Sequence, residues 1–222
     1  MEPGAIGLTL HLAAVTTLVL LLLGTPLAWW LATTRSVLRP AVEALTALPL
    51  VLPPTVLGFY LLILLNPTAP IGAFWVEATG TTLTFSFAGL VVGSVIYSLP
   101  FMVQPLHGAF AAVGPGPLEA AASLRARPLD AFFTVAVPLS VRGFVTACVL
   151  TFAHTVGEFG VVLMIGGNIP GETRVVSIAI YEHVETLRYT DAHVLSAALL
   201  GFSFLVLLAV YGMNRRFPVR AF

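Results

Sequence analysis

Long stretches of this chain carry no charged side chain, and this constrains its fold more than any other feature. No charge lies between Glu2 and Arg35, and a second uncharged stretch runs from Glu43 to Glu77. A helix needs about 20 mostly apolar residues to cross a bilayer. Of the 222 residues, 58% are hydrophobic and 9% are charged, whereas about 25% are charged in an ordinary soluble domain. These stretches exclude a soluble globular protein and predict an all-α, polytopic membrane protein.

The charged residues also limit where each membrane span can lie. We expect five spans, at about residues 10–31, 44–65, 88–110, 143–165 and 192–214. Prolines interrupt the second and third of them: Pro49, Pro53, Pro54, Pro100 and Pro105. Proline removes a backbone donor and kinks a helix, and the membrane tolerates such a break only where protein or a water-filled cavity satisfies the freed groups. Bent central helices favour a gated pathway over a static bundle, with Pro53 and Pro54 as pathway candidates.

The basic residues predict the orientation of the chain. All ten are arginines. Two of them, Arg174 and Arg188, follow the fourth span, and the other eight follow the first, third and fifth spans: Arg35, Arg39, Arg125, Arg127, Arg142, Arg215, Arg216 and Arg220. Cytoplasmic loops carry the basic excess. We therefore expect the N-terminus outside and the C-terminus in the cytoplasm.

Several functions are excluded or disfavoured by what the sequence lacks. A phosphate-binding P-loop needs a lysine and the chain has none, so energy from ATP would have to come from another polypeptide. Cys148 is the only cysteine, which excludes a disulfide scaffold, and no basic cluster exceeds Arg215 with Arg216, which disfavours nucleic-acid binding. His11, His107 and Cys148 lack a metal-ligand spacing. We expect a lipid-embedded chain with no metal and no cofactor.

The segment at residues 114–140 is the most unusual part of the chain. It reads GPGPLEAAASLRARPLDAFFTVAVPLS and predicts a short helix at residues 118–124 after a Gly-Pro break. Its small alanines allow another surface to approach closely, and Glu119 near the helix start favours the helix dipole. Spacing alone leaves two interpretations open: a docking element, or an interfacial loop helix resting on lipid.

The same segment contains a motif that resembles one of a known family. Glu119-Ala120-Ala121, with Leu124 and the downstream Val137-Pro138-Leu139, resembles the EAA loop of ABC-importer permeases of the type I class. The resemblance implies a coupling helix that sits in a groove of a cytoplasmic ATP-binding subunit, with Glu119, Ala120, Ala121, Leu124 and Arg125 as its coupling residues. Arg125 stands where the family pattern has a glycine, which leaves the bend after the helix open.

Two further stretches narrow the resemblance. ALPLVLPPTVLG at residues 47–58 is similar to the second span of molybdate permeases, and GEFG at 157–160 with GNIPGET at 167–173 is similar to a stretch shared by molybdate and sulfate permeases. Sulfate permeases typically have an extra N-terminal span. The chain is therefore identified as resembling a molybdate permease, with one permease domain at residues 8–214 and the coupling loop at 114–140.

The resemblance implies a transport subunit, not an enzyme, in the cell (inner) membrane. It implies a homodimer with the pathway at its two-fold interface, two ATP-binding subunits and an external molybdate-binding protein. A sulfate, thiosulfate or tungstate permease is the nearest alternative. An intramembrane enzyme would need a cluster of catalytic side chains within the spans, and a standalone carrier or channel would leave the 118–124 helix without a purpose.

Two sets of polar residues allow more than one interpretation. His154 and Glu158 are four residues apart in the fourth span, so we expect them on one helix face, either as a proton relay or as a hydrogen-bonded pair that holds the helix. A role for His154 facing an oxyanion is a weaker option. Arg174 and Arg188 either guide an incoming oxyanion or pair with nearby acids, and pairing is favoured. The apolar stretch 175–184 predicts an interfacial helix.

Overall fold

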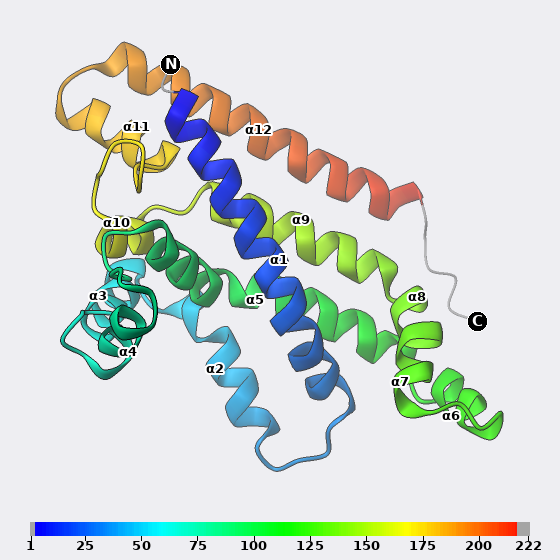
Figure 1. The fold of residues 1–222 in the computed structure, drawn as a ribbon. Helices are drawn as coiled ribbons and strands as arrows, with labels where there is room; N and C mark the ends of the chain where they lie inside the picture. Colours follow the sequence, from blue (N-terminus) through cyan, green and yellow to red (C-terminus); the bar gives the residue numbers. More distant parts are fainter. Residues whose placement is uncertain (1–2, 217–222) are drawn as a thin grey trace.

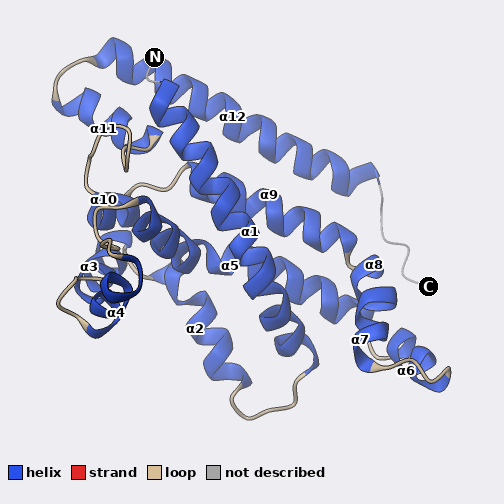
Figure 2. Ribbon diagram, in the orientation of Figure 1, coloured by secondary structure: helices blue, strands red, loops and turns tan. Residues whose placement is uncertain are grey.

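The computed structural model describes residues 3–216, and every regular element in that part of the chain is helical (Figures 1 and 2). Three helices are long and apolar enough to cross a membrane: α1 (Pro3–Thr33), α5 (Phe87–Val113) and α12 (Tyr189–Arg216). The number of spans rises to five if each of two bent helix pairs counts as one span. The all-α membrane architecture is therefore confirmed. Arg220, counted above on the cytoplasmic side, lies outside the described residues.

The second expected span is a bent pair of helices and not one rod. Helix α2 (Arg39–Val51) and helix α3 (Pro54–Leu64) meet at an angle of 112°. Between them Leu52 is extended, and Pro53 has a φ of −54° and a ψ of 133°. Proline at two successive positions removes two backbone donors, and the residue before a proline is pushed out of the helical region. The sequence therefore breaks the span at its middle.

The fourth expected span is also interrupted, but near its C-terminal end. Helix α9 (Val141–Val156) stops three residues before helix α10 (Gly160–Gly166), and Glu158 lies in the break. On its other side α9 meets α7 (Pro128–Ala131), the π-helix η1 (Phe132–Ala136) and α8 (Val137–Leu139) at 72°. Three further short helices lie outside the long ones: α4 (Pro70–Thr79), α6 (Gly116–Ser123) and α11 (Val176–Glu185).

The main core lies between α1, α5 and α9. Leu20 and Leu31 of α1 are buried against Met102 and Leu106 of α5. Gly24 permits this close approach, because a Cβ placed there would lie 2.9 Å from Cγ of Met102. Three aromatic rings pack together near the C-terminal end of α1. The ring of Trp29 lies edge-on to Phe110, with centroids 5.2 Å apart, and edge-on to Phe132, with centroids 5.1 Å apart.

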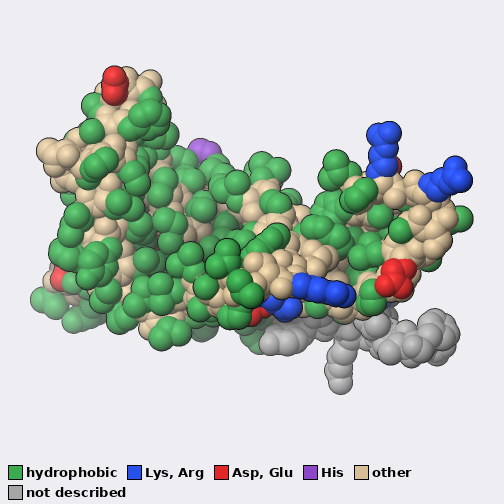
Figure 3. Space-filling view, turned by 90° about the horizontal axis from the view of Figure 1, so that it is seen from below, with side chains coloured by type: hydrophobic (Ala, Val, Ile, Leu, Met, Phe, Trp, Pro, Cys, Tyr) green, Lys and Arg blue, Asp and Glu red, His purple; other side chains and the backbone are tan. Residues whose placement is uncertain are grey.

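Polar and apolar surfaces are segregated along the molecule. Helices α1 and α12 expose large apolar side chains, such as Leu22 and Leu200, which are each 74% exposed. Figure 3 shows hydrophobic side chains over most of one face, with charged side chains gathered mainly at the end that carries α6 and α7 in Figure 1. This distribution suits a bundle whose middle lies in lipid or against another subunit, and whose ends lie in water.

Candidate functional site

A cavity of about 530 Å³ lies where the two helix breaks face the middle of α5. The start of α3 contributes Pro54 and Thr55 to its wall, α5 contributes Tyr97, and the segment from the end of α9 to the start of α10 contributes the rest. The lining residues are Pro54, Thr55, Tyr97, Ala153, His154, Gly157, Glu158, Phe159 and Gly160. Three of the four pathway candidates chosen from the sequence therefore share one cavity, and Pro53 is not among the lining residues.

His154 is held in place by α5 rather than by Glu158. Its Nδ1 lies 2.9 Å from Oγ of Ser98, and Ser98 Oγ also lies 3.0 Å from Oγ1 of Thr155. The imidazole stacks on Phe101 with ring centroids 3.9 Å apart, and Tyr97 lies at 4.9 Å. The hydroxyl of Ser98 thus bridges α5 and α9 at the level of the cavity.

Glu158 is buried and its carboxylate makes no hydrogen bond within residues 3–216. The side chain is 3% exposed, and both carboxylate oxygens lack a hydrogen-bond partner there. Its backbone carbonyl accepts a hydrogen bond from the Ser177 hydroxyl of α11. The expectation that His154 and Glu158 share one helix face is wrong, because α9 ends at Val156 and the chain turns before Glu158. The structure contains no His154–Glu158 hydrogen bond among its described contacts.

Small residues let α3 and α10 pack backbone to backbone beside the cavity. A Cβ on Gly58 of α3 would lie 2.7 Å from Cβ of Met164 and 3.3 Å from Cα of Val161. A Cβ on Gly160 would lie 2.6 Å from Cβ of Pro54. The position of Pro54 in the cavity wall therefore depends on the lack of a side chain at the start of α10.

The cavity offers a few hydrogen-bonding groups in a mostly apolar wall. These groups are the hydroxyls of Thr55 and Tyr97, the ring of His154 and the carboxyl group of Glu158, and no arginine of residues 3–216 lines the cavity. Hydroxyl groups bind a polar solute more weakly than charge-assisted contacts do, which suits a place through which a solute passes. Within residues 3–216 no group of three or more His, Cys, Asp or Glu side chains is placed to hold a metal ion.

The second candidate region is helix α6, at the far end of the bundle from the cavity's helix breaks (Figure 1). No residue of α6 is buried, and Leu124, its C-cap, is 85% exposed. Glu119 lies in the first turn and has no hydrogen bond through its carboxylate among the described contacts. Among the described residues, helix α6 packs mainly on α7 and η1. It therefore presents most of its surface outward.

The turn after α6 keeps the bend that the family pattern forms with a glycine, although Arg125 occupies that position. Arg125 has a φ of 65°, the left-handed conformation in which the family pattern has a glycine. The N–H of Ala126 donates to the carbonyl of Ala121 at 3.0 Å, and the N–H of Arg125 donates to Ala122 at 2.9 Å. These two bonds form a Schellman motif. The bend is kept, at a cost of roughly 1–2 kcal/mol for a residue with a Cβ.

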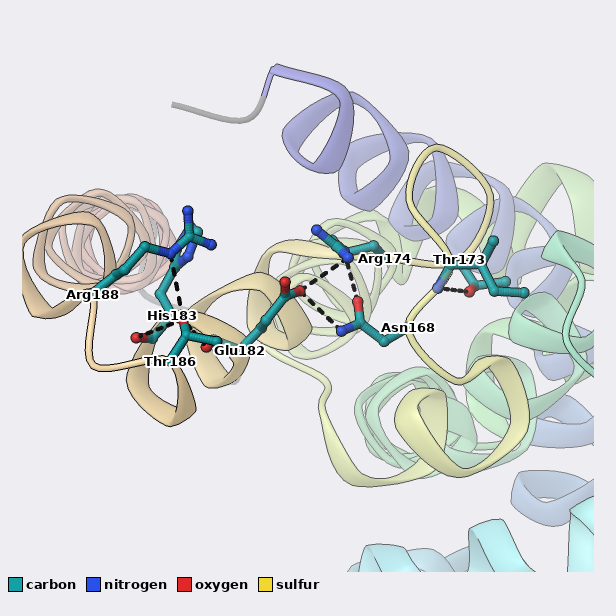
Figure 4. Close-up of polar contacts among 8 residues, drawn as sticks. Asn168, Thr173, Arg174, Glu182, His183, Thr186 and Arg188 are labelled. Carbon is teal, nitrogen blue, oxygen red and sulfur yellow. Dashed lines mark hydrogen bonds and ion pairs between the residues drawn. The ribbon is translucent and has the colours of Figure 1, made fainter.

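The loop after α10 is tied to α11 by a polar network (Figure 4). The guanidinium of Arg174 lies 3.0 Å from the carboxylate of Glu182, and its Nε donates to Oδ1 of Asn168 at 2.6 Å. Asn168 Nδ2 donates to Glu182 at 2.9 Å, which closes the triangle. Arg174 therefore pairs with an acidic residue, Glu182, as the favoured interpretation of the sequence expected. Arg188 Nε lies 3.4 Å from Oγ1 of Thr186.

Sequence reasoning did not assign roles to three residues that organise these regions. Ser98 bridges two helices, Asn168 completes the Arg174 network, and Thr173 is fully buried, with its hydroxyl donating to the carbonyl of Gly166 at 2.7 Å. Asn168 and Thr173 were inside a quoted motif, but nothing in their spacing indicated which partner each would meet. Helix α11 lies at the expected interfacial stretch and packs on α12 and α1.

Comparison with known families now identifies the class of protein. The family described as the inner membrane component of binding-protein-dependent transport systems matches residues 12–220. The chain belongs to this family of permeases. It is therefore a multi-pass, inner-membrane transport subunit and not an enzyme, and it works with a solute-binding protein and an ATP-hydrolysing subunit.

Particular relatives are close over almost the whole chain. The Molybdenum transport system permease protein ModB of Azotobacter vinelandii is 62% identical over 211 residues, which cover 95% of this chain and 93% of that protein. The protein of the same name from Escherichia coli K12 is 34% identical over 82% of this chain and 80% of its own length. The sulfate permease CysT of Synechocystis is 33% identical over 85% of this chain and 65% of its own. The resemblance inferred from the motifs is confirmed.

Solved structures confirm the fold. The chain superposes on the MetNI methionine ABC transporter in an inward-facing conformation with a TM-score of 0.73 at 18% identity, covering 96% of this chain and 94% of that one. A bacterial alginate ABC transporter gives a TM-score of 0.75 at 19% identity, covering 97% of this chain and 79% of the other. The fold is that of an ABC-importer permease.

Proposed function

We propose that this chain forms the membrane pathway of an ATP-driven importer of molybdate. The observation that carries the proposal is the 62% identity to the molybdenum permease of Azotobacter vinelandii over 95% of the chain. The sulfate permease of Synechocystis is also related, at 33% identity. A sulfate, thiosulfate or tungstate importer is therefore the alternative that an experiment has to distinguish.

The pathway is assigned to the interface of a homodimer. One chain has three to five candidate spanning segments, which are few to enclose a route across the membrane, so a second copy completes the wall. The lining residues Thr55, Tyr97 and His154 supply hydrogen-bonding groups that a tetrahedral dianion can contact in passing.

Helix α6 is assigned to the contact with the ATP-binding subunit. The helix lies at one end of the bundle with none of its residues buried, and the structure places Glu119, Ala120 and Ala121 on it with Leu124 and Arg125 in the following turn. Closure of the ATP-binding subunits would move α6, and the bent helices around the cavity would turn the pathway outward. This is a shift between two conformations driven by a partner with different affinity for each.

The orientation places α6 in the cytoplasm and the Arg174 network outside. In support, α1 begins beside α11 and the start of α12, while α12 ends toward α8 (Figure 1), so an odd number of spans joins the two ends. The basic residues after the first and third spans lie at the α6 end, as the distribution of positive charge requires. The molybdate-binding protein would then dock on the side of α11.

Deletion of the gene tests the substrate. Cells without it should lose molybdoenzyme activity at low external molybdate and regain it at high molybdate, because other carriers leak the anion. A requirement for a reduced sulfur source, with molybdoenzyme activity unchanged, would instead establish the sulfate alternative. A control strain that expresses the chain from a plasmid should recover wild-type activity.

A further inference from the structure

Arg125 adopts a backbone conformation that its side chain disfavours. Its φ of 65° is the left-handed region, and the two hydrogen bonds of the Schellman motif hold it there. Glycine would take this conformation without a steric cost. Strained positions persist where the surroundings enforce them, and they cluster at sites where the side chain has a function. The strain at Arg125 therefore raises the question of what its guanidinium does.

Nothing in the described chain uses that guanidinium. Arg125 is exposed and makes no ion pair or hydrogen bond through its side chain with any residue from 3 to 216. Arg127, two residues further on, is also exposed and has a relaxed backbone, with a φ of −71° and a ψ of 156°. Two exposed cations thus flank the end of α6, and only Arg125 is held in a strained conformation.

The surroundings of Arg125 describe the surface that could meet it. Leu124 beside it is 85% exposed, and Leu129 is 71% exposed. Glu119 and Asp130 are exposed as well, so the two cations and two anions of this region balance. Figure 3 shows charged side chains of both signs at this end of the molecule. A surface with both charges and exposed leucines favours a folded protein partner over an anionic lipid surface, which would repel Glu119 and Asp130.

We propose that Arg125 forms an ion pair with a carboxylate of the ATP-binding subunit, at the edge of the groove that receives α6. Leu124 fills an apolar site beside it, and the left-handed turn directs the chain so that the guanidinium leaves α6 at its C-terminal end. Arginine suits this contact because its planar fork can hold a carboxylate by two hydrogen bonds. The proposal rests on the role of α6 proposed above and adds the chemistry of the partner surface.

The test separates the side chain from the backbone. Arg125→Gly removes the guanidinium but relieves the strained turn, so α6 should keep its fold. Arg125→Asn also tolerates the left-handed region, and gives a second neutral variant with a Cβ. Arg35→Gly is the matched control, because Arg35 is an exposed cation in a different loop and has no described partner.

Association of the permease with its ATP-binding subunit is measured in detergent as a function of salt. We expect Arg125→Gly and Arg125→Asn to weaken association by about tenfold or more, the range for loss of a charge-assisted hydrogen bond. Their association should also depend less on salt than that of the wild type, while Arg35→Gly should behave as the wild type. Equal or tighter association of Arg125→Gly would overturn the proposal, and so would an equal loss in Arg35→Gly.

Further outcomes distinguish a failure of the Arg125 ion pair from a failure of the proposed role of α6. If the Arg125 variants lose association only in vesicles that contain phosphatidylglycerol, and not in neutral detergent, the guanidinium contacts lipid headgroups and the proposal is wrong. If Ala121→Trp on α6 leaves association and transport unchanged, the role of α6 itself fails. Unchanged association in Arg125→Gly with loss in Ala121→Trp would overturn only the ion pair.

Discussion

The hydroxyl of Thr173 fixes the loop that leads from α10 to α11. It donates to the carbonyl of Gly166 at 2.7 Å and accepts from the N–H of Ile169 at 3.1 Å, and the residue is fully buried. One side chain thus satisfies the buried carbonyl of Gly166 at the end of α10 and the part-buried N–H of Ile169 in the loop that follows. The adjoining Arg174 can then reach Glu182 on α11 (Figure 4).

Thr173→Val keeps the shape of the side chain but removes both hydrogen bonds. Leaving a buried donor or acceptor without a partner costs roughly 1–3 kcal/mol each, so the apparent Tm of the purified permease should fall by several degrees. Thr173→Ser is the control, because it keeps the hydroxyl. A Tm for the valine variant equal to that of the serine variant would mean that water satisfies these backbone groups.

At this scale the sequence identified residues but not their partners. His154 and Glu158 were correctly placed near each other, since both line one cavity. Their expected contact failed because a helical spacing of four holds only while the helix continues, and α9 ends at Val156. The true partner of His154 is Ser98, 56 residues away. A contact of that kind depends on how two helices pack, and no local pattern indicates it.

Broken helices are the main feature at the level of secondary structure. Pro53 and Pro54 predicted a break in the second span from their lost donors, and the structure gives the angle, 112°. The break before α10 has no proline, so its place could not be read from composition. The left-handed turn at Arg125 was marked only by the family pattern, since an arginine does not itself indicate a positive φ.

Packing of α3 on α10 depends on Gly58, and this gives a second prediction. Gly58→Val would drive a branched side chain into Met164 and the backbone of Val161. Overpacking of this kind typically costs about 1–3 kcal/mol, so the apparent Tm should fall. Gly108→Val on α5 is the control, because a Cβ at Gly108 meets nothing within 4 Å.

The informative quantity is the difference in apparent Tm between Gly58→Val and Gly108→Val. Both introduce the same β-branched residue into a helix, so the intrinsic helix propensity changes alike. A loss confined to Gly58→Val would locate the cost in the α3–α10 contact. Equal losses in both variants would mean that helix propensity, and not packing beside the cavity, sets the stability.

Across the whole molecule, the two ends of the bundle carry different machinery. One end has α11 with the Arg174 network, and the other has α6 with its exposed turn (Figure 1). The distribution of arginines predicts from the sequence which of these ends faces the cytoplasm, because charge is a property of loops that needs no knowledge of packing. The proposed homodimer and the partners' surfaces could not be worked out from one chain's residues, since they depend on groups that other polypeptides supply.

Reporter fusions test the proposed orientation. Fusions after Arg39 and after Arg127 should report the cytoplasm, and fusions within residues 66–84 and 168–191 should report the outside. The physical reason is the excess of arginine retained on the cytoplasmic side. A cytoplasmic signal from residues 66–84 would contradict five spans, and would mean that α2 and α3 form a re-entrant segment and not one bent span.

The most direct test of the central claim is transport by the reconstituted complex. The permease, its ATP-binding subunit and the molybdate-loaded binding protein are assembled in vesicles, and uptake of labelled molybdate is measured with and without ATP. We predict ATP-dependent uptake by the wild type and a large loss in Ala121→Trp, because the added indole overpacks the docking face of α6 while the membrane helices stay unchanged. Uptake of sulfate without molybdate, uptake independent of ATP, or wild-type uptake by Ala121→Trp would contradict the account.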